Sequence, residues 1–247
     1  MHYFNRALLL IFICTGILLT GCNIAGRPTA DVTSTPTPTP RELSSRIGAA
    51  TRATETVHFL IALTGAPVAA EPSGFFTLVT MEGDLKRPDG VLATVTVRSV
   101  TGIAEVRTVS LAGRQYVTNP ITRQWQCVAA DFAFDPAILF DPEVGLSHLL
   151  ETGFEEVELV GIEDIAGQPH YHLRGIVPGE ELRAISYNSL GAGPVAVDLW
   201  AEQATMRAKR IILVDTTTDP EQPSTWTMNF SDYGKPVDVR VPPGADC

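Results

Sequence analysis

The chain has 247 residues, of which 45% are hydrophobic and 19% are charged, and its formal net charge is −10 at pH 7. This acidic balance argues against a nucleic-acid partner and against attachment to an anionic membrane by charge alone, since both require a basic surface. The length allows one domain with a sizeable core behind an N-terminal targeting segment.

The first 21 residues have the three zones of a secretory signal. A short polar start containing Arg6 precedes an almost wholly apolar run over residues 7–19, and the small pair Thr20 and Gly21 follows. A membrane-spanning helix is the alternative, but such a helix needs about 20 apolar residues, more than this run supplies. We therefore expect residues 1–21 to be a signal peptide that is removed.

Cys22 stands directly after this segment, in the sequence "LTGC" (19–22). The four residues resemble the bacterial lipobox, in which the cysteine receives a diacylglyceryl group and becomes the new N-terminus. An ordinary signal peptide followed by a chance cysteine is the alternative. Because two or more acyl chains hold a protein stably at a bilayer, the resemblance implies a lipid anchor at the extracytoplasmic face of the cell membrane.

Residues 22–41 are predicted to be a tether between this anchor and the folded body. Within it, residues 33–40 alternate Thr or Ser with Pro, which removes backbone donors and favours an extended polyproline conformation. At about 3.1 Å per residue, the segment spans up to roughly 60 Å.

The body, residues 42–247, is predicted to be a single domain built mainly of β-strands. Apolar and polar residues alternate in five clear runs: 91–98, 156–159, 195–199, 210–213 and 226–231. Turn signals separate the runs: "RPDG" (87–90), "SVTG" (99–102), "LAGR" (111–114), "IAGQP" (165–169) and "TTDPEQP" (217–223). Short connections favour antiparallel neighbours, so we expect one antiparallel sheet of about ten strands.

Three segments have helical signals: residues 42–54, 134–154 and 177–190. The second contains Asp-Pro pairs at 135–136 and 141–142, in which an N-cap acid precedes Pro at the first helical position. So few helices cannot cover the apolar face of a large sheet completely, and a cavity is the expected consequence.

The densest apolar region outside the strands is predicted to cover and line this cavity. Its members are Phe132, Phe134, Ile138, Leu139, Phe140, Leu146, Leu149 and Leu150. A dry cavity suits a lipid, because burying even a dozen CH₂ groups is worth on the order of 10 kcal/mol. The alternative is that these side chains fill a solid core.

Catalytic and metal-binding motifs are not evident. The sequence contains no G-x-S-x-G elbow, no phosphate-binding glycine loop and no H-E-x-x-H. His170 and His172 alternate on one predicted strand and share a face, but two ligands do not complete a metal site. We interpret them as part of a polar outer face, and we expect no catalytic residue, no metal and no enzymatic activity.

Several segments together resemble the LppX/LprG family of bacterial lipoproteins, which are similar to the LolA/LolB carriers. They are "NPITRQW" (119–125), "FDPAILFDPEVGLSHLLE" (134–151), "EEVELVGIEDIAGQPHYHLRGIVPGEEL" (155–182), "PVAVDLWAE" (194–202), "RIILVD" (210–215) and "MNFSDYGKPVDVRVPP" (228–243). The resemblance implies a strongly bent antiparallel half-barrel, with a few helices on its concave face enclosing an apolar cavity for an acylated lipid or glycolipid. It implies no catalytic residues.

Two functions are consistent with these features. The first is a carrier that takes an acylated lipid or glycolipid at the membrane and delivers it onward, with an envelope transporter or acceptor protein as a possible partner. The second is a non-catalytic interaction or sensor lipoprotein that uses the same sheet as a scaffold. The first predicts a bound lipid and no other cofactor beyond the covalent anchor.

Cys127 and Cys247 remain once Cys14 leaves with the signal and Cys22 takes the lipid. Thiols outside the cytoplasm tend to oxidise, and two cysteines are what one bridge requires. We predict a Cys127–Cys247 disulfide that holds the C-terminal segment beside a strand. Two free or intermolecular thiols are the alternative, since sequence does not give the distance between them.

Overall fold

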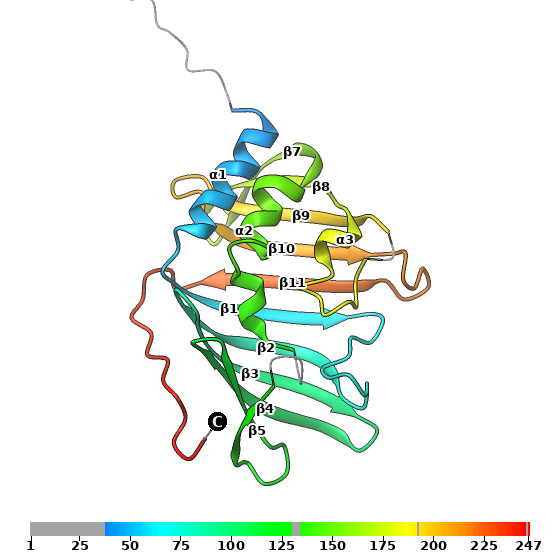
Figure 1. Ribbon diagram of the computed structural model, residues 1–247. Helices are drawn as coiled ribbons and strands as arrows, with labels where there is room; N and C mark the ends of the chain where they lie inside the picture. The colour runs from blue at the N-terminus through cyan, green and yellow to red at the C-terminus, as the bar shows by residue number, and fades with distance from the viewer. Residues whose placement is uncertain (1–37, 130–133, 192, 246) are drawn as a thin grey trace, which may run out of the picture. The chain divides into compact units, whose positions relative to one another are not determined.

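One large antiparallel β-sheet dominates the computed structural model of the protein, which describes residues 38–129, 134–191, 193–245 and 247 (Figure 1). The described residues form eleven strands: β1 (Thr56–Thr64), β2 (Thr77–Lys86), β3 (Gly90–Ser99), β4 (Gly102–Leu111), β5 (Arg114–Thr118), β6 (Trp125–Val128), β7 (Glu155–Ile165), β8 (Gln168–Val177), β9 (Val195–Glu202), β10 (Ala208–Asp215) and β11 (Ser224–Ser231). The predicted alternating runs and turns lie where these strands and their connections are found.

The strands follow the order β6-β5-β4-β3-β2-β1-β11-β10-β9-β8-β7 across the sheet. The chain thus forms two meanders, β1–β6 and β7–β11, and the antiparallel pairing of β1 with β11 joins them. That pairing sets Phe59 beside Phe230 and Ile61 beside Met228, so the apolar faces of the two meanders are continuous. The open, bent antiparallel sheet expected from the sequence is confirmed.

Five short helical elements accompany the sheet in the described chain: α1 (Pro40–Arg52), the 3₁₀-helix η1 (Pro136–Phe140), α2 (Leu146–His148), the π-helix η2 (Leu149–Gly153) and α3 (Gly179–Leu182). Helix α1 starts with a capping box, because the Thr39 hydroxyl accepts from the Glu42 amide and the Glu42 carboxylate accepts from the Thr39 amide. Pro40 occupies the first turn, so α1 begins within the segment assigned to the tether. None of the helices in the described residues is both long and apolar enough to cross a membrane.

Two helical predictions are only partly right. In residues 134–154, Asp135 caps η1 as predicted. Asp141 does not start a helix at Pro142, because its carboxylate accepts hydrogen bonds from the amides of Glu143 and Val144 and holds a turn before α2. In residues 177–190 only α3 is helical. Tyr187 and Asn188 have positive φ angles of 52° and 60°, a conformation that ends a right-handed helix.

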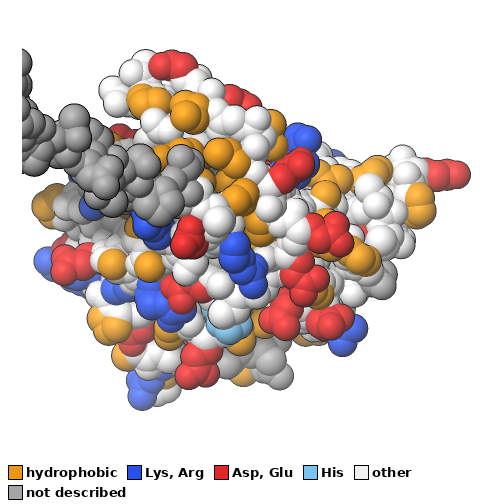
Figure 2. Space-filling view, turned by 90° about the horizontal axis from the view of Figure 1, so that it is seen from above, with side chains coloured by type: hydrophobic (Ala, Val, Ile, Leu, Met, Phe, Trp, Pro, Cys, Tyr) orange, Lys and Arg blue, Asp and Glu red, His pale blue; other side chains and the backbone are white. Residues whose placement is uncertain are grey.

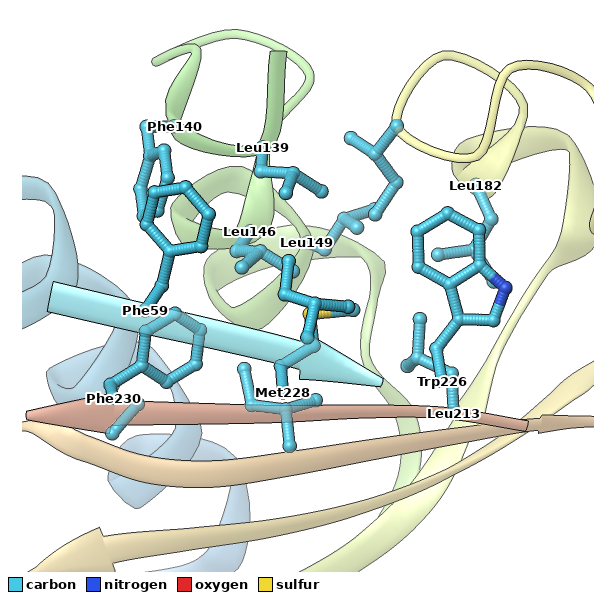
Figure 3. Packing of buried hydrophobic residues seen from close by; sticks show 14 of the residues in the cluster. Phe59, Leu139, Phe140, Leu146, Leu149, Leu182, Leu213, Trp226, Met228 and Phe230 are labelled. Atoms are coloured by element: carbon cyan, nitrogen blue, oxygen red, sulfur yellow. The ribbon is translucent and has the colours of Figure 1, made fainter. Parts of the chain in front are cut away.

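The main core lies between the inner face of the sheet and these helices. Figure 3 shows Leu139, Leu146 and Leu149 on the helical side, above Met228 and Phe230 of β11. All five side chains are at most 5% exposed. This part of the concave face is therefore filled by side chains.

A second apolar cluster lies on the outer face of the sheet, where the C-terminal segment packs against β4 and β5. Figure 1 shows this segment running along the side of the sheet towards β5. Val239 and Ala245 of this segment pack with Val109 of β4 and Tyr116 of β5. Cys127 of β6 and Cys247 are joined by a disulfide, with their Cα atoms 5.3 Å apart. The segment is thus held at its end as well as by packing.

Candidate functional site

The residues predicted to line a cavity fall into three groups. Phe132 lies outside the described residues, as does the proposed anchor Cys22. Four leucines belong to the filled main core: Leu139, Leu146, Leu149 and Leu150. Leu146 also borders a small void of about 10 Å³. The remaining members contribute to two larger pockets: Phe134, Ile138 and Phe140.

The strand pocket is the more apolar of these two pockets, with a volume of about 390 Å³. Its floor is the inner face of β2–β5, formed by Leu78, Val95, Val97, Val106 and Val117. Period-two alternation explains this floor, because every second residue of each strand points to the concave side. Its volume lies in the range of about 300–1,000 Å³ typical of small-molecule sites.

The connection between β1 and β2, residues 65–76, forms one wall of the strand pocket and contributes Phe75 and Phe76. The Glu71 carboxylate fixes this loop by accepting from the amides of Ser73 (2.6 Å) and Phe76 (3.0 Å). Burial alone would raise the pKa of Glu71, but the hydrogen bonds from Ser73 and Phe76 outweigh it and the pKa is lowered. The wall is therefore held by a charged group that faces its own loop.

The connection between β5 and β6, residues 119–124, borders the strand pocket on another side through Asn119 and Pro120. A backbone hydrogen bond of 3.1 Å from Phe134 to Ala70 O ties the remaining wall to the 65–76 loop. The surface of the pocket is mostly apolar, although six polar residues also line it: Glu71, Ser73, Thr108, Thr118, Asn119 and Gln126. The buried hydroxyl of Thr108 has no hydrogen-bond partner in the described structure.

A second pocket, of about 400 Å³, lies at the opposite end of the same strands, beside the β2–β3 and β4–β5 turns. Its lining is more polar and includes Asp89, Arg114, Asp135 and Asp141. Ser110 Oγ donates to Asp135 Oδ1 at 2.5 Å, which occupies one of these carboxylates. Phe134 lines both pockets.

His170 and His172 lie on the outer face of β8, as predicted, but they are buried at 3% and 5% exposure. Nδ1 of His172 is 2.7 Å from Glu163 Oε1, and Nε2 is 2.7 Å from Asp198 Oδ1. Its ring stacks on Trp200, with the ring centroids 4.2 Å apart. Hydrogen bonds from Trp200 and then His172 lower the pKa of Glu163.

This arrangement uses both nitrogens of His172 within the protein, so it fits a structural cluster that covers the outer face. No group of three or more His, Cys, Asp or Glu side chains in the described part of the chain is arranged to hold a metal ion. The surface drawn in Figure 2 shows acidic and basic side chains interspersed with apolar ones.

Sequence reasoning missed the floor of the strand pocket. The Val91–Val97 alternation was interpreted as a strand face, and the cavity was assigned to the 132–150 segment. A usable signal was present, because the inward residues of β3 and β4 are small or β-branched, whereas those of β1 and β11 include Phe59 and Trp226.

The family model of the LppX_LprAFG lipoproteins matches residues 39–239. The lipoarabinomannan carrier protein LprG of Mycolicibacterium smegmatis is 23% identical over 244 residues, which cover 96% of this chain and 95% of that protein. The protein of the same name from Mycolicibacterium hassiacum is 27% identical over 243 residues, with coverages of 96% and 97%.

Solved structures show the same fold. LprF from Mycobacterium bovis superposes with a TM-score of 0.64 at 14% identity, covering 83% of this chain and 97% of that one. LppX from Mycobacterium tuberculosis gives a TM-score of 0.59 at 16% identity, with coverages of 81% and 98%. The family model spans most of the chain and the fold agrees with it, so the protein belongs to the LppX_LprAFG lipoprotein family.

Proposed function

We propose that the protein is a membrane-anchored lipoprotein that binds an acylated lipid or glycolipid and carries or presents it at the cell envelope. The strand pocket carries this proposal, since it is the more apolar of the two large hollows on the concave face, with a volume of about 390 Å³. The names of the two LprG relatives, both lipoarabinomannan carriers, support a lipid or glycolipid as the ligand class.

The chemistry of the pocket fits an acyl chain better than a polar metabolite. Each CH₂ group transferred from water to such a surface contributes about 0.8 kcal/mol, so a dozen contribute on the order of 10 kcal/mol before ordering costs. Val97, Val106 and Val117 supply branched apolar walls. A polar head group would remain at the mouth, where water and charged side chains are available.

The N-terminal segment supports residence at the membrane. In this proposal Cys22 carries the diacylglyceryl anchor after residues 1–21 are removed. Residues 22–41 act as the tether of a body assigned to residues 42–247, and the last two tether residues already form the start of α1. The extracytoplasmic face of the cell membrane is then the place of work, an envelope transporter or acceptor protein receives or supplies the lipid, and no catalytic step is involved.

Ligand uptake by a chain with a filled pocket tests the proposal. Val106 lines the strand pocket, and Val106→Trp places an indole in that space. Thr96 pairs with Glu105 on the neighbouring strand and faces outward, so Thr96→Trp is the matched control. Delipidated wild type and Thr96→Trp are expected to take up a fluorescent fatty-acid analogue saturably, whereas Val106→Trp binds it at least about tenfold more weakly.

Mass spectrometry of lipids retained after native purification provides an independent check. An acylated lipid in wild type that is depleted in Val106→Trp supports the carrier. Absence of saturable uptake by delipidated wild type, together with no retained lipid, would refute it and favour the scaffold function, in which the sheet only presents edges and loops to another envelope protein.

A further inference from the structure

We propose that the loops around the mouth of the strand pocket form a surface that docks on the lipid bilayer, so that an acyl chain passes between membrane and pocket without crossing water. This inference rests on the proposed lipid-binding function and specifies the surface through which it operates. The mouth loops are the β1–β2, β3–β4 and β5–β6 connections, residues 65–76, 99–102 and 119–124.

The antiparallel order of the strands places the mouth loops at one end of the sheet. Thr77, the first residue of β2, pairs with Arg98 near the end of β3, so the 65–76 loop lies beside the β3–β4 turn (Figure 1). Arg123 Nη1 donates to Glu105 O at 2.8 Å, which fixes the β5–β6 connection against the start of β4. Phe75 and Pro120 line the strand pocket itself. The 65–76 and 119–124 loops therefore border the strand pocket, and the β3–β4 turn lies beside the first of them.

Each mouth loop carries an apolar side chain that is exposed to solvent. Val100 is 93% exposed in the β3–β4 turn, Ile121 is 88% exposed in the β5–β6 connection, and Phe75 is 50% exposed in the 65–76 loop. Single exposed apolar residues are common on proteins, but here one stands on each of the three loops at the same end of the sheet as an apolar pocket. Side chains at turn tips can enter a bilayer without disturbing the strands behind them.

Arginines near the mouth offer contacts to lipid phosphates. The chain as a whole carries −10, but the mouth loops and the flanking residues 98–107 and 118–125 contain three arginines and two glutamates, a balance of +1. These residues are Arg98, Arg107, Arg123, Glu71 and Glu105. The β10–β11 connection, which hydrogen-bonds the 65–76 loop through Ala66, adds Asp219 and Glu221 at the same end of the sheet, so net charge does not attract this end to anionic lipids. The three arginines can nevertheless contact individual lipid phosphates.

The bilayer is favoured over a protein partner because of the pocket. A lipid that leaves a membrane through water exposes its chains, and the cost grows with every CH₂ group. Direct contact between the apolar mouth and the acyl region removes this exposure. The tether of the proposed anchor keeps the body close enough to the membrane for repeated contact.

The first experiment places a fluorescent reporter at the mouth. Full chains carrying Ile121→Trp or, as the matched control, Ile162→Trp on β7, where Ile162 is 60% exposed, are mixed with vesicles of phosphatidylcholine and phosphatidylglycerol in equal amounts. Half of each vesicle series contains phosphatidylcholine with brominated acyl chains, which quench nearby indoles. Relative to wild type, additional quenching is expected for Ile121→Trp and none for Ile162→Trp.

The second experiment measures lipid extraction. Val100→Asp/Ile121→Asp is compared with Val160→Asp/Ile162→Asp, which adds the same charge at exposed β7 positions. Transfer of a fluorescent phospholipid from the vesicles to the mouth variant is expected to slow at least about tenfold, a factor that corresponds to about 1.4 kcal/mol. Uptake of a monomeric fatty-acid analogue from water should stay unchanged, since these side chains lie outside the pocket lining. Val100→Ser/Ile121→Ser repeats the test without added charge.

The outcomes separate the two proposals. Equal quenching of both reporters, or extraction that is unchanged in both mouth variants or equally slowed in the β7 control, overturns the docking surface. A concentration-dependent blue shift of the Ile121→Trp emission without vesicles, and no quenching with them, would assign the mouth to a second copy of the chain instead. Mouth-specific quenching in a wild type that takes up no fatty acid would support docking while the carrier proposal fails.

Discussion

Removing the Cys127–Cys247 disulfide is expected to lower the free energy of unfolding by about 5 kcal/mol. The two cysteines lie 120 residues apart in the sequence, and in the chain-entropy model a closed loop of that length restricts the unfolded chain by about 5 kcal/mol at 25 °C. Because a folded domain is stable by only about 5–15 kcal/mol, this one bond is a large part of the total.

The structure indicates where the loss would be felt first. Without the bond, the C-terminal segment is held by packing alone, chiefly Val239 and Ala245 against Val109 and Tyr116. Among the described strands, the edge strand β6 has β5 as its one neighbour in the sheet. We therefore expect the amides of β6 and the C-terminal segment to exchange faster with solvent, while those of β1 and β11 in the centre of the sheet keep their protection.

Urea unfolding of the full chain measures the effect. Cys127→Ser/Cys247→Ser is compared with oxidised wild type, and with wild type kept reduced, which controls for the two serines. Non-reducing peptide mapping of wild type comes first and should recover the 127–247 cross-linked peptides. Full alkylation without reductant, or a loss below about 1 kcal/mol at unchanged m-value, would contradict this reasoning.

Three further predictions concern the fold and the predicted site. Burial alone would raise the pKa of Asp215, but hydrogen bonds from Thr218 and Thr217 dominate and lower it to about 2 from its usual 3.8. The charged form is therefore favoured by folding, so about 2 kcal/mol of stability should be present above pH 4 and lost as the pH falls towards 2. Urea midpoints across this range should show that step in wild type, and a step retained in Asp215→Asn would disprove its origin. Gly83→Ala should destabilise by about 1–3 kcal/mol, because a Cβ there would lie 2.3 Å from Leu92 O in the neighbouring strand; a neutral urea midpoint would mean that β2 and β3 move apart easily. Leu149→Ala should cost about 2–5 kcal/mol and leave fatty-acid affinity unchanged, since Leu149 lies in the filled core; weakened binding in the titration would return Leu149 to the cavity wall.

The strands could be predicted because their signals are local. Alternation in residues 91–98 and 226–231 and the turns between strands need no knowledge of distant residues. The order of the strands in the sheet could not be predicted from local signals. The pairing of β1 with β11 joins residues about 170 positions apart, and no spacing in the sequence specifies this pairing. The family resemblance, not the periodicity, supplied the bent open sheet.

The helical predictions show why local signals can mislead. Asp135 and Asp141 were both expected to cap helices. Asp135 does so for η1 by accepting from the Ala137 amide, whereas Asp141 closes a turn instead. Helix α1 packs closely against α2, because a Cβ on Gly48 would lie 2.9 Å from Ser147 O. Tertiary packing, rather than helix propensity, therefore sets the backbone geometry after residue 141.

His172 illustrates a limit of a different kind. Its place on the outer face of β8 followed from alternation, but its burial depends on Trp200 of β9 and Glu163 of β7. Those partners are adjacent only after three strands have paired in register. A residue that appears exposed on one strand can thus be buried by the side chains of its neighbours.

The position of the strand pocket follows from the sizes of the inward side chains. In the middle of the sheet these side chains are large, as with Phe59 of β1 and Trp226 of β11, and they meet the helices and fill the space between. Towards β4 they become small: Ala104, Val106 and Thr108. The curved sheet keeps its cover at a distance there, and short side chains cannot span the gap, so apolar space remains open. Side-chain size alone is not sufficient, because the equally small inward residues of β9, Val195, Val197 and Ala201, are packed in the filled core. The cavity therefore depends both on small inward residues and on where the connecting segment, through Phe134, covers them.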